Sequence, residues 1–269
     1  MGGQKMQEVR HQIIGDFVSQ LYLLNLLDER FDLYQMVVSE MGFDAVCFSF
    51  EPHSFIKPKI QYAPIFKIST KFPPDFIKIY SEEKWFKHDF TIREISEGNL
   101  QAKDWKQKEH SGELKDKEIA LIQLARKQFK INNAITIPTM NNTIGMAGSS
   151  ILSFGNDDNF TSLKQKNLNT LIVCSRVFSD IILQQPSDFS RTFVFPNLPQ
   201  ITPKERIVLR DLVSQKSLQQ LGVAEGMSES TVSNHLSRLC KKFKVRKTSD
   251  LKYLLISLNI LGGYPRTKD

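Results

Sequence analysis

Prolines interrupt one stretch of this chain so often that no helix can continue through it. Four prolines fall within residues 186–203, and each lacks the backbone N–H that a helix interior needs. They are Pro186, Pro196, Pro199 and Pro203. The chain has 269 residues, about twice the length of a common domain. We therefore expect two domains, residues 1–185 and 201–269, joined by a linker over residues 186–200.

The charge of the chain is divided in the same place. Residues 200–269 contain 13 of the 36 basic residues and 6 of the 29 acidic residues, so this stretch has a net charge of +7. The remaining 23 basic and 23 acidic residues cancel. A compact basic domain beside a neutral one is typical of polyanion binding joined to a second task, although a solvated basic surface gives the same composition.

Several classes of protein are excluded by composition and spacing. The chain is 41% hydrophobic and 24% charged, as in folded globular proteins. Its most apolar stretch, residues 169–183, is interrupted by Arg176 and Asp180 and falls short of the ~18 residues of a membrane helix. The N-terminus has no apolar segment typical of a signal peptide. The three cysteines have no CxxC spacing, so we expect a cytoplasmic protein without disulfides or metal.

The first domain alternates helical and strand patterns. The apolar spacing predicts helices over residues 7–27, 29–41, 74–82, 113–129 and 160–184, with another beginning near Asp89. Alternating β-rich runs predict strands over residues 44–50, 59–69, 133–139 and 143–154. Asn141-Asn142 favours a hairpin between the last two strands. The pattern predicts an α/β/α sandwich, an antiparallel sheet flanked by helices.

The second domain contains only helical patterns. Candidates are residues 203–214, 217–224, 229–243 and 248–261. Thr202 and Glu205 have the spacing of a capping box around Pro203. The two middle helices are joined by a short turn, so we expect an all-α domain of four helices containing a helix-turn-helix.

The third of these helices has two different faces. Its apolar residues, Val232, Leu236, Leu239 and Phe243, are spaced to share one side. The other side is polar and basic: Ser230, Ser233, Asn234, Ser237, Arg238 and Lys241. Asn and Arg suit adenine and guanine edges in the major groove, and Lys suits phosphates. A helix face that is merely solvated remains the alternative.

This region resembles the C-terminal DNA-binding domain of the LuxR regulators, without gaps from Ile201 to Val245. The matching positions are Thr202, Glu205, Leu209, Lys216, Ser228, Glu229, Thr231, Val232, His235, Leu236, Lys242 and Val245. Gln215, Glu225 and Thr248 depart from the usual Gly, Leu and Arg, which affects fine contacts but not the fold. The resemblance implies a homodimer on an inverted-repeat DNA operator, with RNA polymerase or an anti-activator protein as further partners.

Pattern and resemblance together give the candidate DNA-contacting residues. They are Lys216, Ser230, Thr231, Ser233, Asn234, Ser237, Arg238, Lys241 and Lys242. The apolar last helix suits both core packing and a dimer seam.

The first domain resembles the autoinducer-binding domain of acyl-homoserine-lactone receptors at scattered positions. Candidate ligand-binding residues are Phe72, Phe76, Tyr80, Asp89, Trp105 and Ser153. The resemblance implies that Asp89 accepts an amide N–H, that Tyr80 donates to a carbonyl, and that Ser153 bonds a nearby polar group. Phe72, Phe76 and Trp105 would form apolar walls. The family usually has Trp, a hydrogen-bond donor, at Phe76, and Pro at Phe90.

Three ligand hypotheses follow from this departure. The protein binds an acyl-homoserine lactone without that bond, binds a different amphipathic molecule, or acts without ligand as an orphan regulator. A regulator that responds to a protein partner would have a pocket too small for a ligand. Asp89 also fits a plain helix N-cap, and Tyr80 a core tyrosine.

An enzyme is the alternative of a different class. The five histidines form neither an HxxxH nor an HExxH pattern, so a metal hydrolase is not expected. Residues 145–150 resemble neither a nucleophile elbow nor a phosphate loop. We expect a quorum-sensing transcription regulator without catalytic residues, in which operator position decides between activation and repression.

Overall fold

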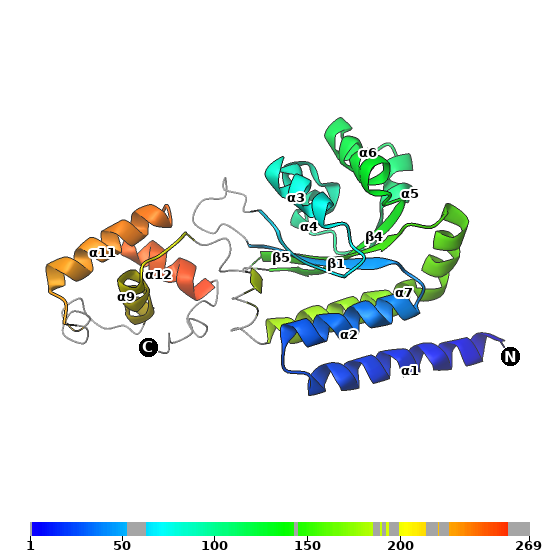
Figure 1. Ribbon diagram of the computed structural model, residues 1–269, viewed down its shortest axis with the longest axis horizontal. Coiled ribbons are helices and arrows are strands. Elements are labelled where there is room, and N and C mark those ends of the chain that lie inside the picture. Colours follow the sequence, from blue (N-terminus) through cyan, green and yellow to red (C-terminus); the bar gives the residue numbers. More distant parts are fainter. Residues whose placement is uncertain are drawn as a thin grey trace. The chain divides into compact units, whose positions relative to one another are not determined.

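The computed structural model describes residues 2–52, 63–142, 145–184, 189, 192–193, 199–213, 220 and 226–257 (Figure 1). Residues 1–52 and 63–184 form one compact unit, and residues 185–269 belong to a second. The predicted linker, residues 186–200, lies mostly outside the described residues, so its role stays a prediction. The two units are treated separately below.

The first unit is organised around one antiparallel sheet. Its strands are β1 (Ala45–Pro52), β2 (Ile65–Ile68), β3 (Lys103–Asp104), β4 (Asn133–Asn141) and β5 (Gly145–Ser153). Their spatial order is β2-β1-β5-β4-β3. The predicted hairpin is confirmed, because β4 and β5 pair along their length. It contains a register shift between Pro138 and Met140, where proline cannot donate to the ladder.

Helices cover both faces of this sheet (Figure 1). One face is covered by α2 (Leu27–Glu40) and α7 (Asp157–Leu183), and α1 (Gly2–Leu23) packs against these two helices on their far side. The other is covered by α3 (Pro74–Glu82), α4 (Phe90–Ser96), α5 (Trp105–His110) and α6 (Asp116–Phe129), with a short 3₁₀ helix at Trp85–His88. The expected α/β/α sandwich is therefore confirmed.

The two faces of the sheet carry different side chains. Successive residues of a strand point to opposite faces, and the register pairs Phe48 with Ser149 and Cys47 with Ser150. The face toward α2 and α7 is bulky and apolar, and Phe48 packs edge-on against Phe178 at 5.4 Å between ring centroids. The face toward α3–α6 carries short side chains at its centre: Cys47, Ser49, Thr136, Gly148 and Ser150. Short side chains leave room above the sheet.

The second unit is helical in its described part. It contains α9 (Pro203–Val213), α11 (Glu229–Lys242) and α12 (Thr248–Ser257) around a buried apolar core. The predicted capping box is confirmed: Glu205 N–H donates to Thr202 Oγ1 at 3.2 Å, and Thr202 N–H donates to Glu205 Oε2 at 2.7 Å. The predicted helix 217–224 lies outside the described residues except for Gln220, and Lys216 lies outside them too.

Candidate functional site

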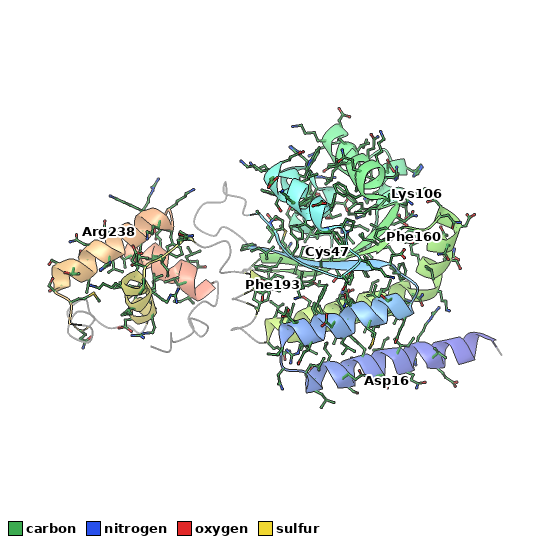
Figure 2. All side chains as sticks on the ribbon, in the orientation of Figure 1. Asp16, Cys47, Lys106, Phe160, Phe193 and Arg238 are labelled. Carbon is green, nitrogen blue, oxygen red and sulfur yellow. The ribbon has the colours of Figure 1, made fainter. Side chains whose placement is uncertain are left out.

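A cavity lies between the short-residue face of the sheet and helices α3–α5. Its volume is about 60 Å³. Five of the six predicted ligand-binding residues line it: Phe72, Phe76, Tyr80, Asp89 and Trp105. Cys47, labelled in Figure 2, belongs to its floor on β1. The residues that were separated in sequence are therefore brought together around one space.

Helix α3 supplies an aromatic wall to this cavity. Pro73 and Pro74 fix the start of the helix, so that Phe76 and Tyr80, four residues apart, lie on its buried side. The ring of Phe76 lies 5.9 Å from that of Tyr80 and 6.3 Å from that of Phe72. Behind it, Phe129 of α6 packs edge-on at 5.3 Å. The wall is held by ring contacts on three sides.

Asp89 has two structural roles. It is the N-cap of α4, accepting from Thr91 N–H at 2.8 Å and from the Thr91 hydroxyl at 2.7 Å on Oδ1. Its other oxygen accepts from the Tyr80 hydroxyl at 2.7 Å. The N-cap and pocket interpretations of Asp89 are thus compatible, because one carboxylate does both.

Burial changes the acidity of this pair. Desolvation raises the pKa of Asp89, and the hydrogen bonds from Thr91 and Tyr80 offset part of that rise. Desolvation, reinforced by the nearby Asp89 charge, raises the pKa of Tyr80 well above its usual value. Tyr80 is therefore a neutral donor, and Asp89 is an acceptor held in an apolar setting.

A second set of hydrogen-bonded polar side chains lies on the floor of the cavity. Trp105 Nε1 donates to Thr136 Oγ1 at 2.9 Å, and Thr136 Oγ1 lies 3.0 Å from Ser150 Oγ. The two hydroxyl residues are directly paired neighbours on β4 and β5. All three residues line the cavity. The floor therefore carries a short chain of hydroxyls beneath the aromatic wall.

The structure does not place Ser153 at this cavity. Ser153 is not among the described residues that line the cavity, and its hydroxyl accepts from Gly155 N–H at 3.3 Å. It lies an odd number of residues from Ser150, so strand alternation turns it to the opposite face. On β5, the serine that lines the cavity is Ser150. Ser49, Thr91 and Thr136 are further pocket residues that the motif comparison missed.

The described lining of the cavity has a marked charge bias. It contains two carboxylate residues, Asp89 and Glu51, and no Lys, Arg or His. Like charges at short range repel each other, so these carboxylates disfavour binding of an anionic head group. The described part of the pocket suits a neutral ligand.

The candidate DNA-contacting face lies on α11. Ser228 caps this helix, accepting from Thr231 N–H at 3.2 Å. Val232, Leu236 and Leu239 are buried, as predicted. The exposed residues are Ser230, Ser233, Asn234, Ser237, Arg238 and Lys241, and Thr231 is half-buried. Arg238, labelled in Figure 2, projects from α11. This exposed face has the side chains that major-groove contact requires.

Lys242 differs from its neighbours on this helix. Its ammonium donates to Glu205 Oε2 at 2.7 Å and to the Gln200 carbonyl at 3.1 Å. Glu205 is 2% exposed, and Lys242 joins the end of α11 to the start of α9. The contact between Lys242 and DNA stays a prediction, and the structure shows that its ammonium also pairs with a buried carboxylate. Sequence spacing could not show a partner 37 residues away.

No group of three or more His, Cys, Asp or Glu residues in the described ranges is placed to hold a metal ion. Among the helices that the structure describes, none is both long enough and apolar enough to span a bilayer.

Comparison with known proteins matches each unit separately. The model of the autoinducer binding domain matches residues 27–180. The model of bacterial regulatory proteins of the luxR family matches residues 199–254. None of the curated protein sequences matches the chain. Both families consist of transcription regulators, in agreement with the sequence interpretation.

Solved structures share the fold at low sequence identity. SdiA in complex with octanoyl-rac-glycerol is 11% identical, with 94% of this chain and 96% of that chain covered and a TM-score of 0.54. Escherichia coli SdiA in a further crystal structure is 11% identical, with 92% and 97% covered and a TM-score of 0.52. At this identity the likeness shows the fold alone. Because the autoinducer-binding model covers more than half of the chain and the luxR model matches residues 199–254 beyond it, this protein belongs to the LuxR family of autoinducer-binding, DNA-binding transcription regulators.

Proposed function

We propose that the cavity of the first unit binds an acylated small-molecule signal and that this binding controls how the second unit engages DNA. The observation that carries the proposal is the Tyr80–Asp89 pair, a hydrogen-bonded polar group set in an apolar cavity. Buried polar groups of this kind fix the orientation of a ligand, and the surrounding apolar walls supply affinity. Acyl-homoserine lactones are the first class to test.

The polar groups of the cavity fit an acyl amide. Asp89 can accept its N–H, and the Ser150 or Thr136 hydroxyl can donate to its carbonyl. Phe72, Phe76 and Trp105 would surround the ring and chain. Ser150 takes the role that the sequence comparison gave to Ser153.

The size of the cavity supports a second candidate function. About 60 Å³ is well below the ~150 Å³ of a cavity that accepts benzene. An acyl chain therefore enters only if side chains such as Phe76 or Ile77 move aside. A regulator that acts without ligand, or on a protein signal, would have its pocket filled in this way by its own aromatic residues.

Thermal melting of the whole protein separates the two candidates. A ligand at about 100 times its dissociation constant adds about 2.7 kcal/mol to the folded state, which shifts the melting temperature by several degrees. The panel would contain acyl-homoserine lactones of different chain length and octanoylglycerol, the class of ligand in the SdiA complex. A shift with one compound supports ligand control. A cooperative melt that no compound shifts favours the ligand-independent regulator.

We further propose that the protein acts in the cytoplasm as a homodimer on an inverted-repeat operator. The proposed base and phosphate contacts are the exposed α11 residues together with Thr231, Lys216 and Lys242. Exposed Ile256 on α12, 50% accessible, supports a dimer seam on that helix. Half-sites one turn of DNA apart, ~34–36 Å, would match the two-fold symmetry.

DNA binding is tested by titration at several salt concentrations. The affinity should fall steeply with salt, because contacts to phosphates release counterions. Arg238→Ala should weaken specific binding by ~1–3 kcal/mol. A flat salt response together with an unaffected Arg238→Ala variant contradicts the DNA assignment.

A further inference from the structure

We propose that helix α1 carries a surface for a second copy of this chain, on which the two α1 helices pair antiparallel about a two-fold axis at Gly15. This surface lies outside residues 27–180, which match the autoinducer-binding family. It is also separate from the dimer seam proposed on α12. The pairing goes beyond the proposed function, because it needs neither a cavity ligand nor DNA.

Helix α1 is the outermost layer of the first unit (Figure 1). Its Phe17 and Leu21 are buried against the layer formed by α2 and α7. Residues 8–16, in contrast, contain no buried side chain. A helical stretch with so little burial is marginal in water, because tertiary packing supplies most of the stability of helices in proteins. A partner that covers the outward face would stabilise this stretch.

The C-terminal end of α1 is fixed to the rest of the unit. Arg30 of α2, which is 4% exposed, donates to the Leu24 carbonyl from Nε at 3.0 Å and from Nη2 at 2.6 Å. Leu24 directly follows the last residue of α1, so the guanidinium satisfies a carbonyl that the helix itself leaves without a donor. Helix α1 is therefore held in one orientation and presents a defined outward face.

This outward face exposes large apolar side chains. Nine large hydrophobic residues are exposed in the described part of the chain, and four of them, Val9, Tyr22, Leu23 and Leu26, lie on α1 or directly after it. Tyr22 is 62% exposed and Leu23 is 79% exposed. Exposed apolar residues that are scattered singly are normal, but a group of them on one element marks an interaction surface.

Gly15 lies at the centre of the same face. Helix geometry places Glu8, Ser19 and Tyr22 within about 40° of Gly15 around the axis, on the side away from the buried Phe17. A Cβ atom at Gly15 would meet nothing within 4 Å, so no contact within the unit requires glycine there. Glycine also weakens the interior of a helix. The close approach of another backbone explains its presence.

The residues around Gly15 are complementary to themselves in an antiparallel pair. Glu8 and Tyr22 lie seven residues to either side of Gly15, so each copy brings its Glu8 opposite Tyr22 of the other. His11 and Ser19 lie four residues to either side and are matched in the same way. The Tyr22 hydroxyl can donate to the Glu8 carboxylate, and the Ser19 hydroxyl can bond with the His11 ring. A parallel pair would instead place Glu8 against Glu8.

A charge placed on the two-fold axis meets its own copy. Gly15→Glu should therefore weaken dimerisation of the full-length protein at least about tenfold, measured by analytical ultracentrifugation without ligand or DNA. Glu is a good helix former and the position is open, so the melting temperature of the variant should stay near that of the unaltered protein. Gln20→Glu is the matched control. It adds the same charge at an exposed position about 140° around α1 and should leave dimerisation unchanged.

Opposite charges on the axis should restore the contact. Gly15→Glu mixed with Gly15→Lys should form a heterodimer that is tighter than the homodimer of either variant. The same ultracentrifugation experiment measures it. A mixture that associates no more tightly than its two components contradicts a two-fold axis at Gly15.

Disulfide crosslinking tests the register independently of affinity. Gly15→Cys should crosslink to its own copy under mild oxidation, because the two Cα atoms on the axis come within disulfide reach. Ser19→Cys should crosslink efficiently only when it is mixed with His11→Cys, and Gln20→Cys should not crosslink. The natural cysteines are buried and leave the background low. Absence of the Gly15→Cys crosslink, or efficient crosslinking of Gln20→Cys, overturns the proposed pairing.

The result for α1 is distinguishable from the proposed function. A dimer that Gly15→Glu leaves intact overturns the pairing of α1 and leaves the seam on α12 standing. A full-length protein that sediments as a monomer without DNA also overturns the pairing, and DNA titration then tests the operator-bound dimer separately. Weakened association of Gly15→Glu, together with the Gly15→Cys crosslink, supports the pairing whatever the cavity binds.

Discussion

The two faces of the central sheet come from the same strands and do opposite things. Toward α2 and α7, Phe48 meets Phe178, and Phe178 stacks on Tyr34 at 4.8 Å. Toward α3–α5, Ser150 and its short neighbours leave a cavity. The difference lies only in which alternate residues are bulky. A face of large rings gives stability, and a face of small polar residues gives a place to bind.

Helix α11 repeats this division. Its apolar side, including Leu236, is buried, and its polar side, including Arg238, is exposed. Its end, however, mixes the two functions: Lys241 is exposed, while the adjacent Lys242 bonds the buried Glu205. Packing and binding are therefore assigned residue by residue within one element.

The largest expected effect is a loss of stability from a substitution at the packed face, the face of the sheet toward α2 and α7. Phe178→Ala removes a ring that contacts Phe31, Tyr34 and Phe48, and should lower the free energy of unfolding by about 3–5 kcal/mol. Urea denaturation measures it. Val173→Ala on the same helix, at a position 37% exposed, should change stability by less than about 0.5 kcal/mol. A small loss at Phe178 would mean that this face is not the stabilising one.

Two adjacent serines test the faces against each other. Ser149→Met inserts a long side chain into the packed face, where Ser149 is 0% exposed, and should destabilise the protein by about 1–3 kcal/mol. Ser150→Met points into the cavity and should destabilise it by less than about 1 kcal/mol while abolishing binding of any cavity ligand. Denaturation and ligand titration of both variants provide the comparison. Equal destabilisation by the two would contradict the assignment of the faces.

Two adjacent lysines test the division between packing and DNA binding on α11. Lys242→Ala leaves the Glu205 carboxylate buried without its cation and should lower stability by about 1–3 kcal/mol. Lys241→Ala should leave stability unchanged but reduce the slope of log affinity against log salt by about 0.9. Melting and DNA titration distinguish the two effects. The distinction fails if Lys242→Ala changes the salt slope and Lys241→Ala does not.

The smallest expected effect is a pair of opposite pH dependences. The pKa of Asp89 is raised by burial, so its contribution to stability is present at low pH and is lost as the pH rises through its folded-state pKa. Burial also raises the pKa of Glu205, but the bonds from Lys242 and Thr202 outweigh it and the net pKa is lowered. Its stabilising effect is present above its unfolded value and is lost as the pH falls.

The corresponding measurement is the melting temperature of Asp89→Asn and Glu205→Gln between acid and neutral pH. Relative to the unaltered protein, Asp89→Asn should gain stability as the pH rises, and Glu205→Gln should lose it. Parallel curves for the two variants would show that these carboxylates do not sit in opposite environments.

Local sequence signals predicted much of this architecture. The capping box at Thr202 and Glu205 and the four-residue spacing of Phe76 and Tyr80 depend on neighbours in sequence, and both were confirmed. The cavity position of Ser150 and the ion pair of Lys242 were not predicted, for a different reason. Which face of a strand lines a cavity depends on the helices that cover it, and which lysine is free depends on a distant carboxylate. A further signal was present along β1, where the short side chains of Cys47 and Ser49 alternate with the bulky ones of Phe48 and Phe50.

The short residues of the sheet floor have a consequence for how this protein can change over evolutionary time. Exchanging Cys47, Ser49 or Ser150 for a slightly larger or smaller residue alters the shape of the cavity. It leaves Phe48 and Phe178 untouched, since they lie on the other side of the strands. Stability and recognition are thereby encoded in separate alternating positions. A lineage can alter which signal it detects by single substitutions, without first acquiring mutations that restore its fold.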